Sequence, residues 1–206
     1  MSRLMKILPV LTAALIAATI PASSQDAPPP PPELEAMIQK MTEAGSPNRN
    51  HKILDAFVGY WNAESSFWME GRDKPPMVNR GNAQFAWALG GRFLKLDYRG
   101  SFMGGEMVGI GYYGYDNMQK KYTQMWMDNT ATAFFPAVGS MDEKGKAITM
   151  IGPMDDPATG EMGKTVKYVI TMPQNDRFAF EMHDMSITGP DKMVGEIIYT
   201  RAAEHR

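Results

Sequence analysis

The fold is decided by residues 79–128, which read NRGNAQFAWALGGRFLKLDYRGSFMGGEMVGIGYYGYDNMQKKYTQMWMD. Two pairs of turn-forming residues, Gly90-Gly91 and Asp116-Asn117, separate runs that are rich in strand-forming residues. A glycine pair tolerates the positive φ angles of a tight hairpin, and Asp and Asn are common in turns. The segment therefore predicts four consecutive antiparallel strands, Asn79–Leu89, Arg92–Gly100, Glu106–Tyr115 and Lys121–Asp128.

The strand pattern continues on both sides of this segment. Clusters of Gly, Pro, Asn and Asp separate the runs, and the longest such cluster is Gly152–Gly163. Short strands with period-2 alternation predict an all-β sandwich or barrel, and a meander of about ten strands hides both edges most simply by closing. We therefore predict an all-β antiparallel meander closed into a barrel. Its further strands are Tyr60–Met69, Ala133–Met141, Ala147–Ile151, Thr165–Met172, Arg177–Met185 and Met193–Arg201.

Residues 1–24 have the pattern of a secretory signal peptide. Arg3 and Lys6 precede an apolar run that is shorter than the roughly 20 residues needed to span a bilayer, and small residues follow it. We expect cleavage after Ser24, with Ala22 as the second choice, and therefore a periplasmic or secreted protein without a transmembrane segment. The alternative is a short N-terminal membrane anchor.

Charge and cysteine content exclude several classes of partner and chemistry. The chain contains 21 Lys and Arg residues and 23 Asp and Glu residues. The predicted signal peptide contains two of the basic residues and none of the acidic ones, so 19 bases face 23 acids in the mature chain. This balance argues against nucleic acid or an anionic membrane as a partner. The absence of cysteine excludes disulfides and thiolate chemistry.

Residues 25–50 are predicted to form a spacer and a short helix ahead of a barrel domain over residues 51–206. Five consecutive prolines, Pro28–Pro32, favour an extended polyproline II segment. The next run, Glu33–Ala44, has apolar residues at helical spacing and acidic residues in its first turn. We expect its apolar stripe to pack across the folded domain rather than to bind a partner. The stripe consists of Leu34, Met37, Ile38 and Met41.

Two segments at the ends of the strand region favour closure of the barrel. One or two helical turns over His51–Val58 lead into Gly59 and Trp61 at the first strand, and Arg201 ends the last strand. First and last strands are neighbours in a closed meander, so the guanidinium of Arg201 could lie over the indole of Trp61. In this the chain resembles the lipocalin-like, or calycin, barrels, in which an Arg from the last strand packs across the Trp of a Gly-x-Trp motif.

A closer resemblance covers about residues 51–201. The sequence is similar to the bacterial domain-of-unknown-function 1579 family, whose pattern includes a Gly-x-Trp start, a Gly-Gly-Arg-Phe-Leu segment and a terminal Tyr-Thr-Arg. The resemblance implies a secreted or periplasmic calycin-like barrel and supplies no catalytic residues. The matching segments are Leu54–Trp61, Gly90–Leu94, Gly109–Asp116, Trp126 with Asp128, and Tyr199–Arg201.

Residues 109–114 fit the Gly-x-Gly-x-x-Gly fingerprint of dinucleotide sites, but their context argues against that function. The fingerprint works where a strand passes into a helix whose N-terminus holds the pyrophosphate. Here Asp116 and Asn117 end the segment in a turn, and Lys121 begins another strand. The glycines instead allow a bent strand or leave room for bulky neighbours such as Trp126.

Nucleophile and zincin motifs are missing from the sequence. It has no Cys and no Gly-x-Ser-x-Gly, and its histidines, His51, His183 and His205, lack the helical spacing of a zinc site. Strand alternation places His183 beside Glu181 on the solvent-exposed face of the strand. We therefore assign no catalytic residue, no metal ligand and no cofactor, and leave open whether the protein is an enzyme.

Methionine is the one unusual feature of the composition, with 19 residues in the chain. Thioethers bind Cu(I), so Met182 and Met185 with His183, or Met125 with Met127, are candidate ligands for a soft metal. The methionines are nevertheless spread over nearly every strand, as expected of residues that fill core gaps and line adaptable pockets. Cu(I) binding is thus an alternative rather than the main hypothesis.

The pattern that best indicates binding lies on the central strands. The alternate residues of Lys121–Asp128 mix aromatic area with a few polar groups, as ligand pockets do. A buried Asp128 would need a partner, and Arg92 is a possible one. A structural ion pair inside a filled barrel fits the pattern equally well. The predicted ligand-binding residues are Arg92, Tyr98, Tyr122, Gln124, Trp126 and Asp128.

Three functional hypotheses follow. The first is a barrel that binds a small, partly apolar molecule in its interior. The second is a hydrolase or isomerase that uses Asp128 with Tyr98 or His183 as an acid and base pair. The third is an interaction protein of the cell envelope, for which a filled barrel beside a large exposed apolar patch would be the signature.

Overall fold

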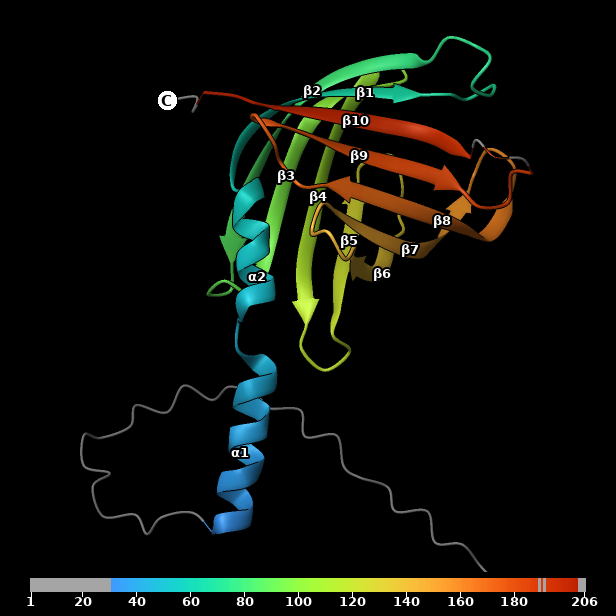
Figure 1. Cartoon of the computed structure of the whole chain (residues 1–206). Coiled ribbons are helices and arrows are strands. Elements are labelled where there is room, and N and C mark those ends of the chain that lie inside the picture. Colours follow the sequence, from blue (N-terminus) through green and yellow to red (C-terminus); the bar gives the residue numbers. More distant parts are fainter. Residues whose placement is uncertain (1–30, 189, 191, 204–206) are drawn as a thin grey trace, which may run out of the picture. The chain divides into compact units, whose positions relative to one another are not determined.

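A computed structural model of the chain describes residues 31–188, 190 and 192–203 (Figure 1). The chain divides into one unit that ends at Gln39 and a second that begins at Lys40, and each is described by itself. The expected signal peptide, residues 1–24, and its cleavage site lie outside the described residues. Among the residues that are described, no helix has the length and apolar character needed to cross a membrane.

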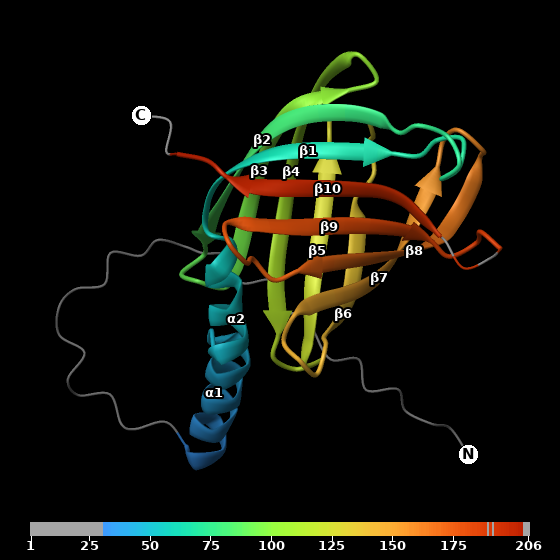
Figure 2. The ribbon, with the colours of Figure 1, turned by 45° about the horizontal axis from the view of Figure 1, so that its top comes forward.

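Ten antiparallel strands form a closed barrel (Figures 1 and 2). Each strand pairs with its neighbours in sequence, and β1 pairs with β10, so closure removes both edges of the sheet. The predicted all-β meander closed into a barrel is confirmed. The strands are β1 (Gly59–Phe67), β2 (Met77–Ala88), β3 (Phe93–Phe102), β4 (Gly105–Asp116), β5 (Lys121–Asp128), β6 (Phe135–Met141), β7 (Ala147–Asp156), β8 (Glu161–Thr171), β9 (Arg177–Asp184) and β10 (Met193–Arg201).

Strands β7 and β8 are longer than the sequence predicts. The expected turn over Gly152–Gly163 is wrong, because pairing continues through Gly152 and Pro153 and the turn occupies only residues 157–160. Pro153 is tolerated in a strand because the pairing of β7 with β6 ends at Ile151. Its missing N–H therefore removes no ladder bond on that side.

Three helical segments precede the barrel: α1 (Pro32–Gly45), α2 (Arg49–Ile53) and the 3-10 helix η1 (Leu54–Phe57). The predicted N-terminal helix is thus present. Its apolar stripe is exposed, since α1 has no buried residue. The expected packing of that stripe across the folded domain concerns both units of the chain and stays a prediction.

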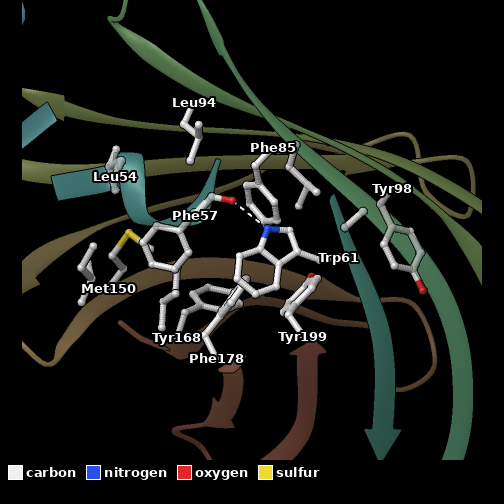
Figure 3. Close-up of a cluster of buried hydrophobic side chains, with 14 of the residues drawn as sticks. Leu54, Phe57, Trp61, Phe85, Leu94, Tyr98, Met150, Tyr168, Phe178 and Tyr199 are labelled. Atoms are coloured by element: carbon white, nitrogen blue, oxygen red, sulfur yellow. Dashed lines mark hydrogen bonds between the residues drawn. The ribbon is translucent and has the colours of Figure 1, made fainter. Parts of the chain in front are cut away.

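The η1 helix supplies part of the hydrophobic core at one end of the barrel, here called the closed end (Figure 3). Leu54 and Phe57 are each 3% exposed, and Phe57 packs edge-on against Phe178. Trp61 is completely buried and donates its indole N–H to the carbonyl oxygen of Phe57 at 2.7 Å. The opposite end, where the β1–β2, β3–β4, β5–β6, β7–β8 and β9–β10 loops lie, is here called the open end.

His51 holds the start of α2 in a capping box with Asn48. The backbone N–H of Asn48 donates to Nδ1 of His51 at 3.1 Å, and the Asn48 side chain accepts from the backbone of α2. Burial and, to a smaller extent, the positive charge of Arg92 lower the pKa of His51 below its usual value. The unprotonated Nδ1 that the cap requires is therefore favoured in the folded state.

This cap predicts a pH dependence of stability. Because the pKa of His51 is lower in the folded chain than in the unfolded one, its contribution is fully present above the unfolded value of about 6.5 and is lost as the pH falls through the folded value. We expect His51→Gln, whose amide can accept the same bond, to flatten the decline in the free energy of unfolding between about pH 7 and pH 5. Urea denaturation of both proteins at each pH measures this. An identical decline in the variant would show that His51 is not responsible.

Candidate functional site

Three residues of the predicted binding face form one connected group in the barrel interior. The rings of Tyr98 on β3 and Trp126 on β5 meet edge to face, with centroids 6.2 Å apart. The indole N–H of Trp126 donates to a carboxylate oxygen of Asp128 at 2.7 Å. The other oxygen of Asp128 accepts from the backbone N–H of Thr130 at 2.8 Å. Aromatic surface and an oriented carboxylate thus lie side by side toward the open end.

Glycines on β2, β3 and β4 make room for these two rings. A Cβ atom at Gly109 on β4 would overlap the ring of Trp126, and one at Gly81 or Gly100 would lie 2.5 Å from the hydroxyl of Tyr98. The glycines of residues 109–111 therefore accommodate a bulky neighbour within a strand, and this segment leads into no helix. Tyr98 and Trp126 lie along the barrel wall as a result.

Among the residues that the structure describes, two buried side-chain polar atoms have no hydrogen-bond partner. Asn79 on β2 and Gln124 on β5 are 7% and 5% exposed, and Nδ2 of Asn79 and Oε1 of Gln124 are buried without a partner. Both side chains point into the barrel, since the immediate neighbours of each residue along its strand are exposed or only partly buried. A buried donor or acceptor left unpaired costs about 1–3 kcal/mol. The interior thus offers one free donor and one free acceptor.

Methionine side chains fill much of the remaining space toward the open end. Met107, Met154 and Met182, from β4, β7 and β9, are partly buried and pack against the core. Unbranched thioether chains adapt to irregular gaps, which explains their abundance without a metal. Strand alternation places Met182 and His183 on opposite faces of β9, so these two side chains do not converge on one ion.

The closed end contains a small apolar cavity. Its volume is about 20 Å³, which is close to the space that one water molecule occupies. Leu54 and Phe57 of η1 and Tyr122 of β5 contribute to its lining. Burial, together with the neighbouring Tyr115, raises the pKa of Tyr122. The barrel is therefore filled, not hollow, at this end.

Comparison with known proteins agrees with this architecture. Residues 46–201 match the model of the family described as protein of unknown function (DUF1579). The chain belongs to the DUF1579 family. The fold of this DUF1579 chain is similar to the crystal structure of Rv2717c from M. tuberculosis, with a TM-score of 0.54 and 14% identity, over 77% of this chain and 100% of that chain. No curated protein matches the sequence.

Arg92 does not join the interior group of the DUF1579 barrel. It lies in the β2–β3 turn and donates to the carbonyl oxygen of Leu89 at 3.1 Å. The suggested pairing of Arg92 with Asp128 is wrong, because the carboxylate of Asp128 is occupied by Trp126 and Thr130. The six predicted residues are therefore spread from the closed end, at Tyr122, to the open half, at Asp128.

The geometry argues against His183 as the partner of Asp128 in the acid and base pair suggested for an enzyme. His183 lies on the outer face of β9 and its Nε2 is 2.9 Å from a carboxylate oxygen of Glu181. Asp128 belongs to the inward series of β5, so the two side chains lie on different sides of the barrel wall. Tyr98 contacts Trp126, and burial raises the pKa of its hydroxyl.

Sequence reasoning missed a charged group inside the DUF1579 barrel. Lys164 on β8 is inward-facing, and its ammonium lies 2.9 Å from Asp184 and 3.0 Å from Asp156. The hydrogen bond and charge of Asp184, followed by those of Asp156, raise the pKa of Lys164. Alternation with Val166, Tyr168 and Ile170 could have revealed it, but the predicted strand began one residue too late.

The residues expected to close the DUF1579 barrel come together at the closed end. Arg201 is paired with Trp61 across β10 and β1, and its guanidinium carbon lies 4.0 Å from the centre of the indole ring. The guanidinium also donates to the carbonyl oxygen of Val58 at 3.0 Å and to Asp176 at 2.8 Å. Gly59 has a φ of +125°, and a Cβ there would lie 2.8 Å from the same guanidinium. Glycine is therefore required for this approach.

Proposed function

We propose that this DUF1579 protein binds a small, partly apolar molecule in the interior of the barrel. The observation that carries the proposal is the pair of buried, unpartnered polar atoms, Nδ2 of Asn79 and Oε1 of Gln124. Interior polar groups without partners are rare in folded proteins, and each one needs a physical explanation, of which a functional role is one. A bound molecule with an acceptor and a donor would satisfy both.

The aromatic and methionine side chains support an apolar component of the ligand. Tyr98 and Trp126 present ring surfaces, and the partly buried Met107, Met154 and Met182 are easily displaced because unbranched chains have many accessible conformations. The ligand would take its space from these methionines, since the cavity at the closed end has room for little more than a water molecule. Asp128, held by Trp126, would orient a polar group at the entrance.

Export is part of the same proposal. The basic start, short apolar run and small residues of positions 1–24 support delivery to the periplasm or to the medium. Native mass spectrometry of protein recovered from the periplasm without refolding tests both points. The mass expected for cleavage after Ser24 would support export, and an additional organic mass would support the ligand.

The role of Gln124 gives a sharper test. We expect Gln124→Leu to lower the affinity for the fluorescent probe 1-anilinonaphthalene-8-sulfonate, or for the recovered ligand, at least about tenfold, because the free acceptor is lost. The free energy of unfolding of the same variant should be about 1 kcal/mol higher than that of the wild type, since the substitution removes an unpaired buried polar group. Fluorescence titration and urea denaturation measure the two effects.

Met125→Leu is the matched control, because Met125 lies on the outer face of the same strand. It should leave both affinity and stability unchanged. A Gln124→Leu variant that binds normally and is destabilised would mean that Gln124 is a structural residue, and the proposed site would then be wrong.

A further inference from the structure

Each connection at the open end of the barrel carries a large exposed apolar side chain, either within the loop or, for Met162, at the start of the strand that follows it. Met103 in the β3–β4 turn is 68% exposed, Phe134 before β6 is 64% exposed, and Met162 beside the β7–β8 turn is 75% exposed. The β1–β2 and β9–β10 loops contribute residues of the same kind. We call this set the apolar rim; it comprises Met69, Met103, Phe134, Met162, Met185 and Ile187.

The closed end differs from the open end. Its exposed large apolar residues in the turns between strands are Leu89 and Met118, among the residues that the structure describes. The β6–β7 turn there is built from charged residues and glycine, over positions 142–146. Scattered apolar residues are normal on a protein surface, but one at every connection of a single end is not. We therefore expect the apolar rim to be a surface that contacts another molecule.

The loops of the open end carry no net charge. Among the described residues of 68–76, 103–104, 129–134, 157–162 and 185–192, three acidic residues balance three basic ones. The acids are Glu70, Asp73 and Glu161, and the bases are Arg72, Lys74 and Lys192. Adsorption to anionic lipid relies on an excess of Lys and Arg, which this end lacks. The electrostatic match for the open end of the barrel is a surface that also carries no net charge.

A tryptophan with the character of an interfacial residue accompanies the rim. The guanidinium of Arg72 lies 3.8 Å above the centre of the Trp68 ring in the β1–β2 loop. Tryptophan is favoured at the boundary between acyl chains and headgroups because its ring is apolar and its N–H is polar. Arginine likewise keeps its charge in water while its stem covers apolar surface.

We propose that the apolar rim inserts into a zwitterionic lipid surface, with the open end of the barrel facing the lipid. The rim residues come from four separate loops and from the start of β8, so a protein partner would need a separate pocket for each of these five sites. A fluid lipid layer accommodates tips in any arrangement, and flexible methionines insert without a fixed geometry. This inference goes beyond the interior site and does not depend on it, because it concerns only outward-pointing residues.

The test is co-sedimentation of the mature chain with phosphatidylcholine vesicles. We expect the wild-type protein to partition into the vesicle pellet, and the double variant Met103→Ser/Phe134→Ser to bind at least about tenfold more weakly, because two of the inserted side chains are lost. The control Leu89→Ser/Met118→Ser removes equally exposed residues from the closed end and should bind like the wild type. Circular dichroism and thermal unfolding confirm that both variants remain folded.

Several results would overturn the proposal. Equal loss of binding in the two double variants would mean that the vesicles adsorb any apolar side chain. Stronger binding to phosphatidylglycerol than to phosphatidylcholine, or no binding to either, would contradict the charge argument. Concentration-dependent self-association that only the rim variant abolishes would assign the rim to a second copy of the chain. Probe binding by the rim variants keeps this test separate from that of the interior site, which Gln124→Leu addresses.

Discussion

Trp61→Ala is expected to lower the free energy of unfolding by about 4 kcal/mol, as is typical when a buried tryptophan is truncated. Trp61 is completely buried, donates to Phe57, and packs edge-on against Phe178 with ring centroids 4.7 Å apart. The substitution also leaves the guanidinium of Arg201 without the ring below it. Urea denaturation followed by circular dichroism measures the change.

Trp68→Ala provides the matched control. Trp68 is half-buried in a loop at the open end and stacks with Arg72, so we expect a loss of less than about 1 kcal/mol. If both substitutions lowered the free energy of unfolding by the same amount, the closure of the barrel at Trp61 would be no more important for stability than a loop contact. A Trp61→Phe variant keeps most of the packing and isolates the contribution of the hydrogen bond to Phe57.

Lys164→Met is expected to destabilise the barrel by about 3 kcal/mol. The side chains of Lys164 and Asp184 are 10% and 9% exposed, so removal of the ammonium leaves a carboxylate nearly buried and without its ion-pair partner. Lys95→Met is the control, because Lys95 and Asp97 form a partly exposed ion pair whose loss should cost much less than that of the Lys164 pair. The free energy of unfolding at neutral pH distinguishes the two.

The same ion pair sets the response to acid. Burial by itself raises the pKa of Asp184, but hydrogen bonds from Ser186 and Lys164 and the charge of Lys164 outweigh it, so the pKa lies below the usual value. This contribution is fully present above the unfolded value of about 3.9 and is lost as the pH falls through the lower, folded value. The wild type should therefore lose stability more steeply than Lys164→Met below about pH 4. Parallel curves would show that the pair does not contribute.

The strands and their faces could be predicted because the alternation of apolar residues is regular. In β8 and β9, for example, Tyr168, Ile170 and Phe178 all lie in the core as their positions predict. The prediction was wrong over Gly152–Gly163, where turn-forming residues belong to strands that pair with only one neighbour at that point. Local composition does not reveal such long-range pairing.

The candidate site was harder to predict from the sequence. Alternation correctly placed Tyr98, Gln124 and Trp126 in the interior, but it says nothing about where along the barrel axis each residue lies. That height depends on how the strands are staggered around the barrel, which is why Arg92 and Asp128 did not pair as suggested. Asn79 was overlooked because a single amide in a strand has no distinctive pattern.

The contact between Arg201 and the segment before β1 has a consequence for how the chain folds. The hydrogen bond from Arg201 to the carbonyl oxygen of Val58 joins positions 143 residues apart. Every other strand pairs with its immediate neighbour and can form as a local hairpin, whereas closure requires the first and last strands to meet across the longest loop in the chain. We therefore expect closure to be the slow, late event of folding. A sheet that has not yet closed would expose one unpaired edge on β1 and one on β10, so we expect the risk of aggregation to be greatest before closure.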